Sequence, residues 1–484
     1  MRRTATLPFI LLLLAACSTN PVTGKREFNM VSENQELQMG SEGHVGVLRE
    51  YRVYSEKPEL NRLVNDVGQE IARASERPNL PWTFTVLDTP MVNAMALPGG
   101  YIYITRGMLE RINSRDELAG VLGHEIAHVT ARHAAQRISR MQLAQFGMLL
   151  GAVVAGPSTY QQYGQFIELG ATLLFQRYSR TQETQADLVG TGYLARTGFN
   201  PVGAERMLIA LQRLSKGETS SIERYFMSHP DPGKRVNDVR KKIAEVGGTY
   251  DLPDRGRYVA LLDGVITGNS TQHITIKDDT VYDRDHGIIL AAPQGWVPTT
   301  APGAFFVMHP KEKANTYFVA QEAEAAELGR TTNAQDAVRQ RFQQMGLQYL
   351  SSGTVTTRSG ERFVIDQWAA QTQQGAVSVE TTQFAHGDHV AVLIFVTPSR
   401  RRGESPLGAM VERMLVDRNR ARAATPPRLK VASSRRGDTW SALAQRATGN
   451  TRDAETIANI NGFAVNDAVP VGILVKLPEE VPEE

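Results

Sequence analysis

Hydrophobic residues recur at helical spacing in the first half of this chain. Between residues 48 and 74 they fall at every third or fourth position, which predicts a helix that ends before Pro78. Residues 84–87 alternate between apolar and polar, and residues 101–105 are β-branched and aromatic, so both are predicted strands. This half is therefore predicted to be mainly helical with a small sheet.

After residue 250 the pattern changes to short strands separated by turns, with one helical stretch at 334–344. This alternation predicts an α+β module over residues 250–417. The predicted strands include 258–262, 274–276, 287–291 and 390–396. A linker rich in Arg, Ala and Pro, residues 418–428, precedes a last small module at 429–479. The chain as a whole is assigned to the α+β class.

The N-terminus has the pattern of an export signal. Two arginines precede an apolar run at 7–16, which is shorter than the roughly 20 residues that span a membrane. The run ends in Leu-Ala-Ala-Cys, which resembles the lipobox of bacterial lipoproteins, and Cys17 would then carry the lipid. Residues 1–16 are thus predicted to be a lipoprotein signal peptide; an uncleaved signal with an ordinary cysteine is the alternative. The resemblance to Gram-negative lipoproteins, with the non-acidic Ser18 after the cysteine, implies sorting to the outer membrane, and the polar residues 18–43 are predicted to be a tether.

A strongly apolar stretch lies between residues 141 and 175. Its two hydrophobic runs are each shorter than the about 18–20 residues that a membrane span needs. Two short helices or a hydrophobic hairpin are predicted. Packing in the core is preferred to covering a cleft or touching a membrane or client protein.

Composition excludes several functions. The chain has 53 basic and 51 acidic residues, a net charge of +2, so it has no strong field for nucleic acid. Cys17 is the only cysteine, so internal disulfides and thiolate ligands are excluded from the mature chain. Any metal site must therefore use histidines and carboxylates.

One predicted helix carries the candidate chemistry. His124, Glu125 and His128 follow one another in the order H-E-x-x-H, and the pair Ser114 and Glu117 predicts a capping box at the helix start. Two imidazoles one turn apart can bind a zinc ion, and the glutamate is placed to take a proton from water at that ion. The helix is expected to bury one apolar face and to present the imidazoles on another. The alternative is a solvent-exposed helix face on which the H-E-x-x-H sequence occurs by chance.

A second predicted helix supplies two carboxylates. Ser179 and Gln182 predict a capping box at its start, and Gly198 predicts its end. Glu183 would complete a site of two histidines and one glutamate, with water in the fourth position. Asp187, one turn later, could orient a ligand histidine through its second ring nitrogen. Taken alone, such a pair more often lies at the surface.

His229 is the best remaining candidate to approach the metal. It stands in Ser-His-Pro, shortly before a predicted helix that contains Arg235. It could stabilise an oxyanion or occupy the open coordination position as a switch. A capping or packing histidine is an equal alternative.

The strand at 101–105 leads almost directly to the H-E-x-x-H helix. As an edge strand beside a metal cleft it could pair with an extended peptide through main-chain hydrogen bonds. A plain internal strand is the alternative.

These motifs resemble those of one family of zinc peptidases, which includes the HtpX heat-shock protease and the CAAX prenyl protease. The similar segments are Asn93, LPGGYIYITRGML at 97–109, HEIAH at 124–128, SRTQETQAD at 179–187 and His229-Pro230. The resemblance implies a gluzincin-like zincin domain with endopeptidase activity, zinc ligands His124, His128 and Glu183, and general base Glu125. Lipidation and the lack of long spans make the chain similar to the soluble periplasmic members of the BepA type. Unlike many of those, it has no helical repeat after the catalytic domain, so their partner contacts are not carried over.

Two weaker resemblances concern the later modules. IILAAPQGW at 288–296 is similar to the start of Mog1/PsbP-like domains. Residues 429–479 resemble a LysM domain, a βααβ unit, which implies peptidoglycan contact through the loops after Val431 and near Asn461. The first strand, 429–432, departs from the LysM pattern, and a scaffold role is the alternative.

The sequence therefore predicts a zinc metalloprotease domain at 17–248, followed by the modules at 250–417 and 429–479. The predicted function is a zinc-dependent endopeptidase, lipid-anchored to the outer membrane in the bacterial periplasm, that degrades misfolded or stalled envelope proteins. Its partners would be those proteins, the membrane and, through the tail, peptidoglycan, with no nucleic acid. A non-catalytic envelope adaptor tethered to peptidoglycan is the rival, and cell-wall hydrolysis is a third interpretation.

Overall fold

The computed structural model describes most of the chain. The described residues are 17–143, 177–216, 229, 233–250, 255–301, 303–311, 316–324, 334–372, 375–386, 389–399 and 405–479. The predicted signal peptide, and residues 144–176 of the apolar stretch, lie outside them.

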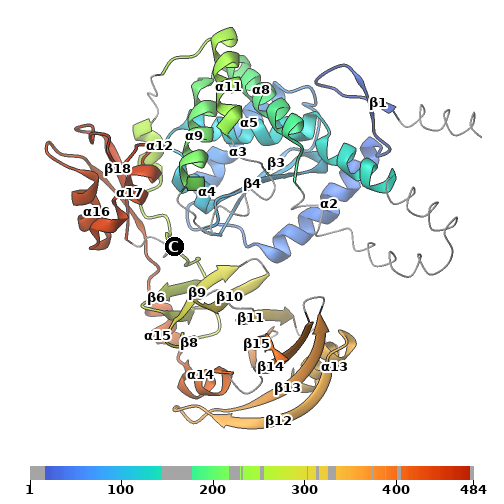
Figure 1. Ribbon diagram of the computed structural model, residues 1–484, viewed down its shortest axis with the longest axis vertical. Coiled ribbons are helices and arrows are strands. Elements are labelled where there is room, and N and C mark those ends of the chain that lie inside the picture. Colours follow the sequence, from blue (N-terminus) through green and yellow to red (C-terminus); the bar gives the residue numbers. More distant parts are fainter. Residues whose placement is uncertain are drawn as a thin grey trace, which may run out of the picture. The chain divides into compact units, whose positions relative to one another are not determined.

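The chain divides into two compact units, both with helices and strands (Figure 1). The first unit joins the residues up to Val265 with those from Leu429 onward, and the second runs from Ile266 to Arg428. Two segments far apart in sequence therefore share the first unit.

The metal-binding candidates lie in the first unit, in a helical layer beside a small sheet. Its helices are α2 (Glu33–Glu50), α3 (Pro58–Arg73), α4 (Arg106–Arg111), α5 (Arg115–Thr130), α8 (Arg180–Thr197), α9 (Val202–Lys216), α11 (Gly233–Val246) and α12 (Arg255–Leu261). Helix α5 carries the H-E-x-x-H motif, and α3, α8, α9 and a strand pack against it.

Helix α5 is buried on all sides, which corrects the prediction of one buried face. Every residue from Asp116 to Thr130 is buried, the two motif histidines included. Neighbours on every side remove the need for a polar face, as in other helices at the centre of a domain. The imidazoles therefore face an interior site.

The small sheet has the order β3-β5-β4, with bounds Thr83–Leu87, Tyr101–Thr105 and Ala94–Leu97 for β3, β5 and β4. Both predicted strands are confirmed. Strand β5 is central, however, since it pairs in parallel with β3 and antiparallel with β4. The expected edge role of residues 101–105 is therefore wrong, and β4 is the edge strand that packs on α5.

Three local predictions are wrong. The expected tether forms a hairpin of β1 (Cys17–Thr19) and β2 (Arg26–Phe28), followed directly by α2. Asn20 donates to the carbonyl oxygen of Ala131 at the end of α5, so this segment packs on the domain. The predicted helix at 48–74 is two helices with a break at 51–57, and the predicted strand at 258–262 is instead covered largely by α12. In each case tertiary contacts override a local pattern.

The second unit contains two antiparallel sheets and short helices. One sheet has the order β12-β13-β14-β15-β11-β10-β9 and the other β16-β8-β7-β6. The strands are β6 (Ile274–Lys277), β7 (Thr280–Asp283), β8 (Ile288–Ala291), β9 (Trp296–Ala301), β10 (Ala304–Pro310), β11 (Tyr317–Glu324), β12 (Gln348–Thr356), β13 (Arg362–Thr372), β14 (Gly375–His386), β15 (His389–Pro398) and β16 (Leu415–Val416). The helices are α13 (Ala334–Gln344), α14 (Leu407–Arg413) and α15 (Arg418–Ala423).

Helix α13 agrees with the predicted helix. The expected linker at 418–428 begins instead with α15, which packs on β7 and β8, so this segment belongs to the second unit.

Residues 429–479, called the C-terminal module below, have the element order β17 (Leu429–Ser433), α16 (Trp440–Thr448), α17 (Ala454–Ile460) and β18 (Leu474–Pro478). The two strands pair antiparallel, and Trp440 and Leu443 lie in a small buried core. This is the βααβ order expected from the sequence.

None of the helices among the described residues combines the length and the apolar character that crossing a membrane requires.

Candidate active site

Helix α5 starts at a well-defined cap. The Ser114 hydroxyl accepts a hydrogen bond from the backbone N–H of Glu117 at 3.1 Å, which is half of the predicted capping box. The Glu117 carboxylate accepts instead from the backbone N–H of Asn113, at 2.7 Å. The carboxylate thus binds the N–H one residue before the one that a capping box would use. The cap residue Ser114 fixes the start of the helix ten positions before His124.

Helix α8 brings the third candidate ligand. Its predicted capping box between Ser179 and Gln182 is present, and it ends at Gly198, which has a left-handed backbone with φ 77°. The helix crosses α5 at two glycines: a Cβ added to Gly190 would lie 2.9 Å from the carbonyl carbon of Gly123. Only glycine permits α5 and α8 to approach this closely. The close packing of the two helices places Glu183 beside the α5 histidines.

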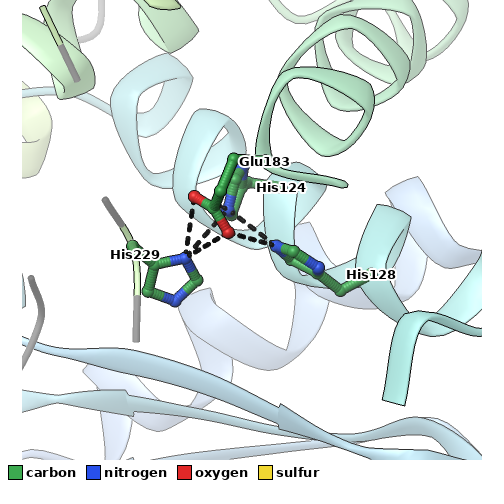
Figure 2. Close-up of side chains that lie close together, drawn as sticks. All are labelled: His124, His128, Glu183 and His229. Atoms are coloured by element: carbon green, nitrogen blue, oxygen red, sulfur yellow. Dashed lines mark hydrogen bonds and ion pairs between the residues drawn. The ribbon is translucent and has the colours of Figure 1, made fainter. Parts of the chain in front are cut away.

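Four buried side chains point toward one small volume, as Figure 2 shows. They are His124, His128, Glu183 and His229, and one donor atom of each lies within 4.8 Å of the others. The Nε2 atoms of His124 and His128 are 3.0 Å apart, and Nε2 of His128 lies 3.3 Å from Oε1 of Glu183. Nδ1 of His229 lies 3.0 Å from that oxygen and 3.4 Å from Nε2 of His124.

These spacings fit a single tetrahedral ion. Four ligands at about 2.0–2.1 Å from one zinc ion are separated from one another by about 3.3–3.4 Å. The contacts above, together with 3.8 Å between Nε2 of His124 and Oε2 of Glu183, scatter around that value. Three imidazole nitrogens and one carboxylate are donors that suit zinc. The residues present therefore fit a metal ion.

His124 is held by a charged pair behind it. Its Nδ1 lies 2.9 Å from Oδ1 of Asp187, and Arg235 on α11 donates to both oxygens of that carboxylate, at 2.6 and 2.8 Å. Burial alone would raise the pKa of Asp187, but Arg235 and His124 outweigh it and lower that pKa. Asp187 is therefore a buried carboxylate anion in contact with the metal-facing ring.

The same arginine also touches the metal-facing carboxylate. Arg235 Nη1 lies 2.7 Å from Oε2 of Glu183. Burial would raise the pKa of Glu183, but His229 and Arg235 outweigh this effect and hold that pKa well below its usual range. Arg235 was expected only as part of a helix, and its two ion pairs could not be inferred from spacing.

His128 is held by a different kind of partner. Its Nδ1 lies 2.8 Å from Nδ1 of His133, whose Nε2 lies 2.9 Å from Oε1 of Gln185. Burial lowers the pKa of His133 to about 4, so this ring is neutral at pH 7. His133 was not among the predicted site residues, and the third histidine five residues after H-E-x-x-H was its one signal in the sequence.

The turn after α5 explains how His133 reaches His128. Arg132 has a left-handed backbone with φ 59°, which is uncommon for a residue other than glycine. Its guanidinium is fixed by Glu36 at 2.9 Å and by the carbonyl oxygen of Val31 at 2.7 Å. This reversal starts the helical stretch 133–143 and turns His133 back under the site.

Glu125 lies beside the four clustered side chains but is not one of them. Its Oε1 is 3.8 Å from Nε2 of His229, and its Oε2 is buried with no hydrogen-bond partner among the described residues. Burial raises the pKa of Glu125, while His229 and His124 oppose that rise. A buried carboxylate oxygen without a partner beside four metal-type donors is expected where a water or substrate group binds.

Two imidazoles from an H-E-x-x-H helix, with a carboxylate from a later helix, are the arrangement expected for the metal centre of a metallopeptidase. Residues 58–243 match the model of peptidase family M48, and this part of the chain belongs to that family. Membership and the buried cluster together imply a metal ion at the site.

The chain is similar to named peptidases over a little under half of its length. It is 30% identical over 227 residues to the mitochondrial metalloendopeptidase OMA1 of Schizosaccharomyces pombe, covering 46% of this chain and 66% of that protein. It is 27% identical over 240 residues to the beta-barrel assembly-enhancing protease of Escherichia coli K12, covering 48% of each chain. The chain thus spans about half the length of the second relative and just under two thirds of the first.

A cyanobacterial PsbP from Synechocystis has 13% sequence identity to this chain, with a TM-score of 0.23, covering 32% of this chain and 98% of that one. This likeness supports no assignment.

Proposed function

We propose that the protein is a zinc-dependent endopeptidase that acts on misfolded or stalled envelope proteins in the bacterial periplasm. The observation that carries the proposal is the convergence of His124, His128, Glu183 and His229 on one ion-sized volume beside Glu125. The named peptidases that are similar to a little under half of the chain support the reaction class.

The proposed zinc ligands are Nε2 of His124, Nε2 of His128 and the carboxylate of Glu183. A zinc ion there would supply Lewis acidity, which polarises a peptide carbonyl and activates water near neutral pH. Asp187 and His133 would orient the two imidazoles through their second nitrogens, so that Nε2 of each ring is free to bind the ion.

Glu125 is the proposed general base. Its buried carboxylate accepts the proton of the attacking water and then delivers a proton to the leaving amine nitrogen. The pKa raised by burial favours this second step, because it makes the protonated carboxyl easier to form.

His229 is proposed to take the fourth ligand position in the conformation described here. Its Nδ1 lies as close to Glu183 as the α5 histidines lie to one another. With His229 there, four side chains would fill a tetrahedral site, and His229 would move aside to admit water. A displaced His229 would then be available to stabilise the oxyanion of the tetrahedral intermediate.

The proposed substrate is an extended segment of polypeptide. Strand β4 is one of the two edge strands of the small sheet, and it packs on helix α5. A peptide added to that edge would be read through its backbone, which suits clients that share no sequence.

The proposed location is the outer membrane, facing the periplasm, with lipid attached to Cys17. The lipobox-like sequence supports the anchor, and the similarity to a beta-barrel assembly-enhancing protease supports envelope clients. Binding of the C-terminal module to peptidoglycan stays a prediction from its LysM-like sequence.

Cleavage of an unfolded protein tests the proposal. The purified chain should cut it, a chelator should stop cleavage, and added zinc should restore it. Glu125→Gln should bind zinc normally and cut at least about a hundredfold more slowly. Equal cleavage by Glu125→Gln and the natural chain would overturn the assigned mechanism. Client binding without any cleavage would favour the adaptor, and glycan or stem-peptide products from purified sacculi would favour cell-wall hydrolysis.

A further inference from the structure

A lysine of the C-terminal module reaches the turn before the metal-binding helix. Lys476 on β18 has 0% exposure, and its Nζ donates to the carbonyl oxygens of Glu110 and Ile112, at 2.6 and 2.9 Å. These carbonyls belong to the last residue but one of α4 and to the residue that caps it. Unpaired carbonyls at a helix end are common acceptors for lysine.

The burial of Lys476 depends on this contact. A buried amine without partners would be strongly unfavourable, and the carbonyls of the α4 end supply them. Both side-chain acceptors of Lys476 lie outside its own module. The burial of Lys476 therefore favours a module that stays bound to the peptidase domain.

The module holds Lys476 in place from its own side. The Asn461 amide oxygen accepts from the backbone N–H of Lys476 at 2.8 Å, and its amide nitrogen donates to the carbonyl oxygens of Lys476 and Ile457, each at 2.9 Å. Asn461 lies in one of the two loops expected to contact glycan, but its side chain is buried and used within the module.

Two further contacts join the same surfaces. A Cβ added to Gly462 would lie 3.3 Å from the side-chain nitrogen of Asn113, so the two loops touch. Leu429 lies on the paired strand, two residues before Val431, the partner of Lys476. It donates its backbone N–H to the carbonyl oxygen of Val265 at 2.7 Å and accepts from the backbone N–H of Gly264 at 2.7 Å. The module is therefore tied to the rest of the first unit at the Gly462 loop and near one end of its strand pair.

We infer that the C-terminal module is a built-in clamp of the peptidase domain, which fastens the α4–α5 turn through Lys476 and so fixes the start of the H-E-x-x-H helix. The turn runs from Ile112 to Ser114, and the same short segment contains Asn113, whose N–H binds the Glu117 carboxylate. The clamp goes beyond the proposed peptidase activity and does not depend on it.

Hydrogen exchange on the metal-free full-length chain tests the clamp. Lys476→Met keeps the length of the side chain and removes its donor. Backbone amides at 109–118 should then exchange about tenfold faster, because two buried hydrogen bonds are lost, while amides in α16 stay protected. The matched control is Lys430→Met on the paired strand, since that side chain is 70% exposed. Equal protection at 109–118 in both variants would overturn the inference.

A disulfide test does not depend on the stability of the lysine variant. In a Cys17→Ser background, Asn113→Cys with Gly462→Cys should form a disulfide readily under mild oxidation. The control pairs Asn113→Cys with Gly437→Cys, which has a similar left-handed backbone, φ 88° against 83°, but no neighbour within 4 Å of an added Cβ. Equal cross-linking of the two pairs, or none in either, would show that the module is not docked at this turn.

Discussion

The two histidines of the H-E-x-x-H helix face the same ion-sized volume but are supported by opposite kinds of partner. Behind His124 stands a buried ion pair, in which Asp187 contacts the ring and Arg235 neutralises the carboxylate. Behind His128 stands a neutral chain, in which His133 contacts the ring and Gln185 contacts His133. Both orient a ring, but only the first is made of charged side chains.

This difference has a physical consequence. A carboxylate behind an imidazole makes the ring a more basic ligand, whereas a neutral imidazole mainly fixes its tautomer and its angle. Breaking the ion pair behind His124 should also cost more stability than breaking the hydrogen bonds behind His128. The reason is that an uncompensated buried charge costs more free energy than a lost neutral hydrogen bond. The largest effects of substitution are therefore expected behind His124.

Arg235→Met should have the largest effect. It leaves the buried carboxylates of Asp187 and Glu183 without their cation, so the metal-free protein should lose about 3–5 kcal/mol of unfolding free energy. Zinc should reduce that loss, because the ion restores positive charge beside Glu183. Denaturant unfolding with and without zinc measures both effects. Lys241→Met on the same helix is the control, since that side chain is 78% exposed, lies 3.8 Å from Asp238 and should cost about 1 kcal/mol or less. Equal losses in the two variants would contradict the account.

Asp187→Asn should weaken zinc binding by about ten- to a hundredfold, because His124 loses its anionic partner while the shape of the side chain is kept. Competition with a coloured chelator measures the affinity. Asp238→Asn, on the exposed side of α11 beside Lys241, is the control and should leave the affinity unchanged. An unchanged affinity in Asp187→Asn would remove the charged support from the account.

His133→Phe should weaken zinc binding by about tenfold, because the Nδ1–H of His128 loses its acceptor. His133→Asn should recover much of that loss, since its amide oxygen occupies nearly the position of the lost ring nitrogen. The same competition assay compares the three proteins. Equal affinities for the Phe and Asn variants would mean that His133 fills space and does not orient His128.

Gln185→Leu should have the smallest effect, about two- to threefold in zinc affinity, because it removes one neutral hydrogen bond two steps from the ion. A loss of zinc affinity as large as that of Asp187→Asn would contradict the claim that the charged partners of His124 matter more than the neutral partners of His128.

The sequence predicted the members of the buried cluster better than the side chains behind them. His124, His128 and Glu183 could be proposed because helical spacing and capping signals place side chains on a helix, whereas His229 was proposed only as the best remaining histidine. Asp187 was also foreseen, since it lies one turn after Glu183. These predictions concern contacts within one helix or between residues in recognisable motifs.

The remaining site contacts depend on how elements meet in space. His133 reaches His128 only through the left-handed backbone of Arg132, which Glu36 fixes from another helix. The close crossing of α5 and α8 depends on Gly190, whose role is invisible in a pattern of polar and apolar residues.

The same reason explains the wrong predictions about exposure. Helix α5 was expected to bury one face and present its imidazoles on another, and residues 101–105 were considered as an edge strand with an internal strand as the equal alternative. Both outcomes depend on which neighbours pack against an element, and hydrophobic periodicity reports only the element's own pattern. The docking of Lys476 over a separation of more than 360 residues from Ile112 is the extreme case.

Anomalous diffraction at the zinc absorption edge, on crystals of the zinc-loaded chain, tests the central claim most directly. The account predicts one ion within bonding distance of Nε2 of His124, Nε2 of His128 and a carboxylate oxygen of Glu183. Zinc bound elsewhere, or no ion among these side chains at saturating zinc, would contradict it.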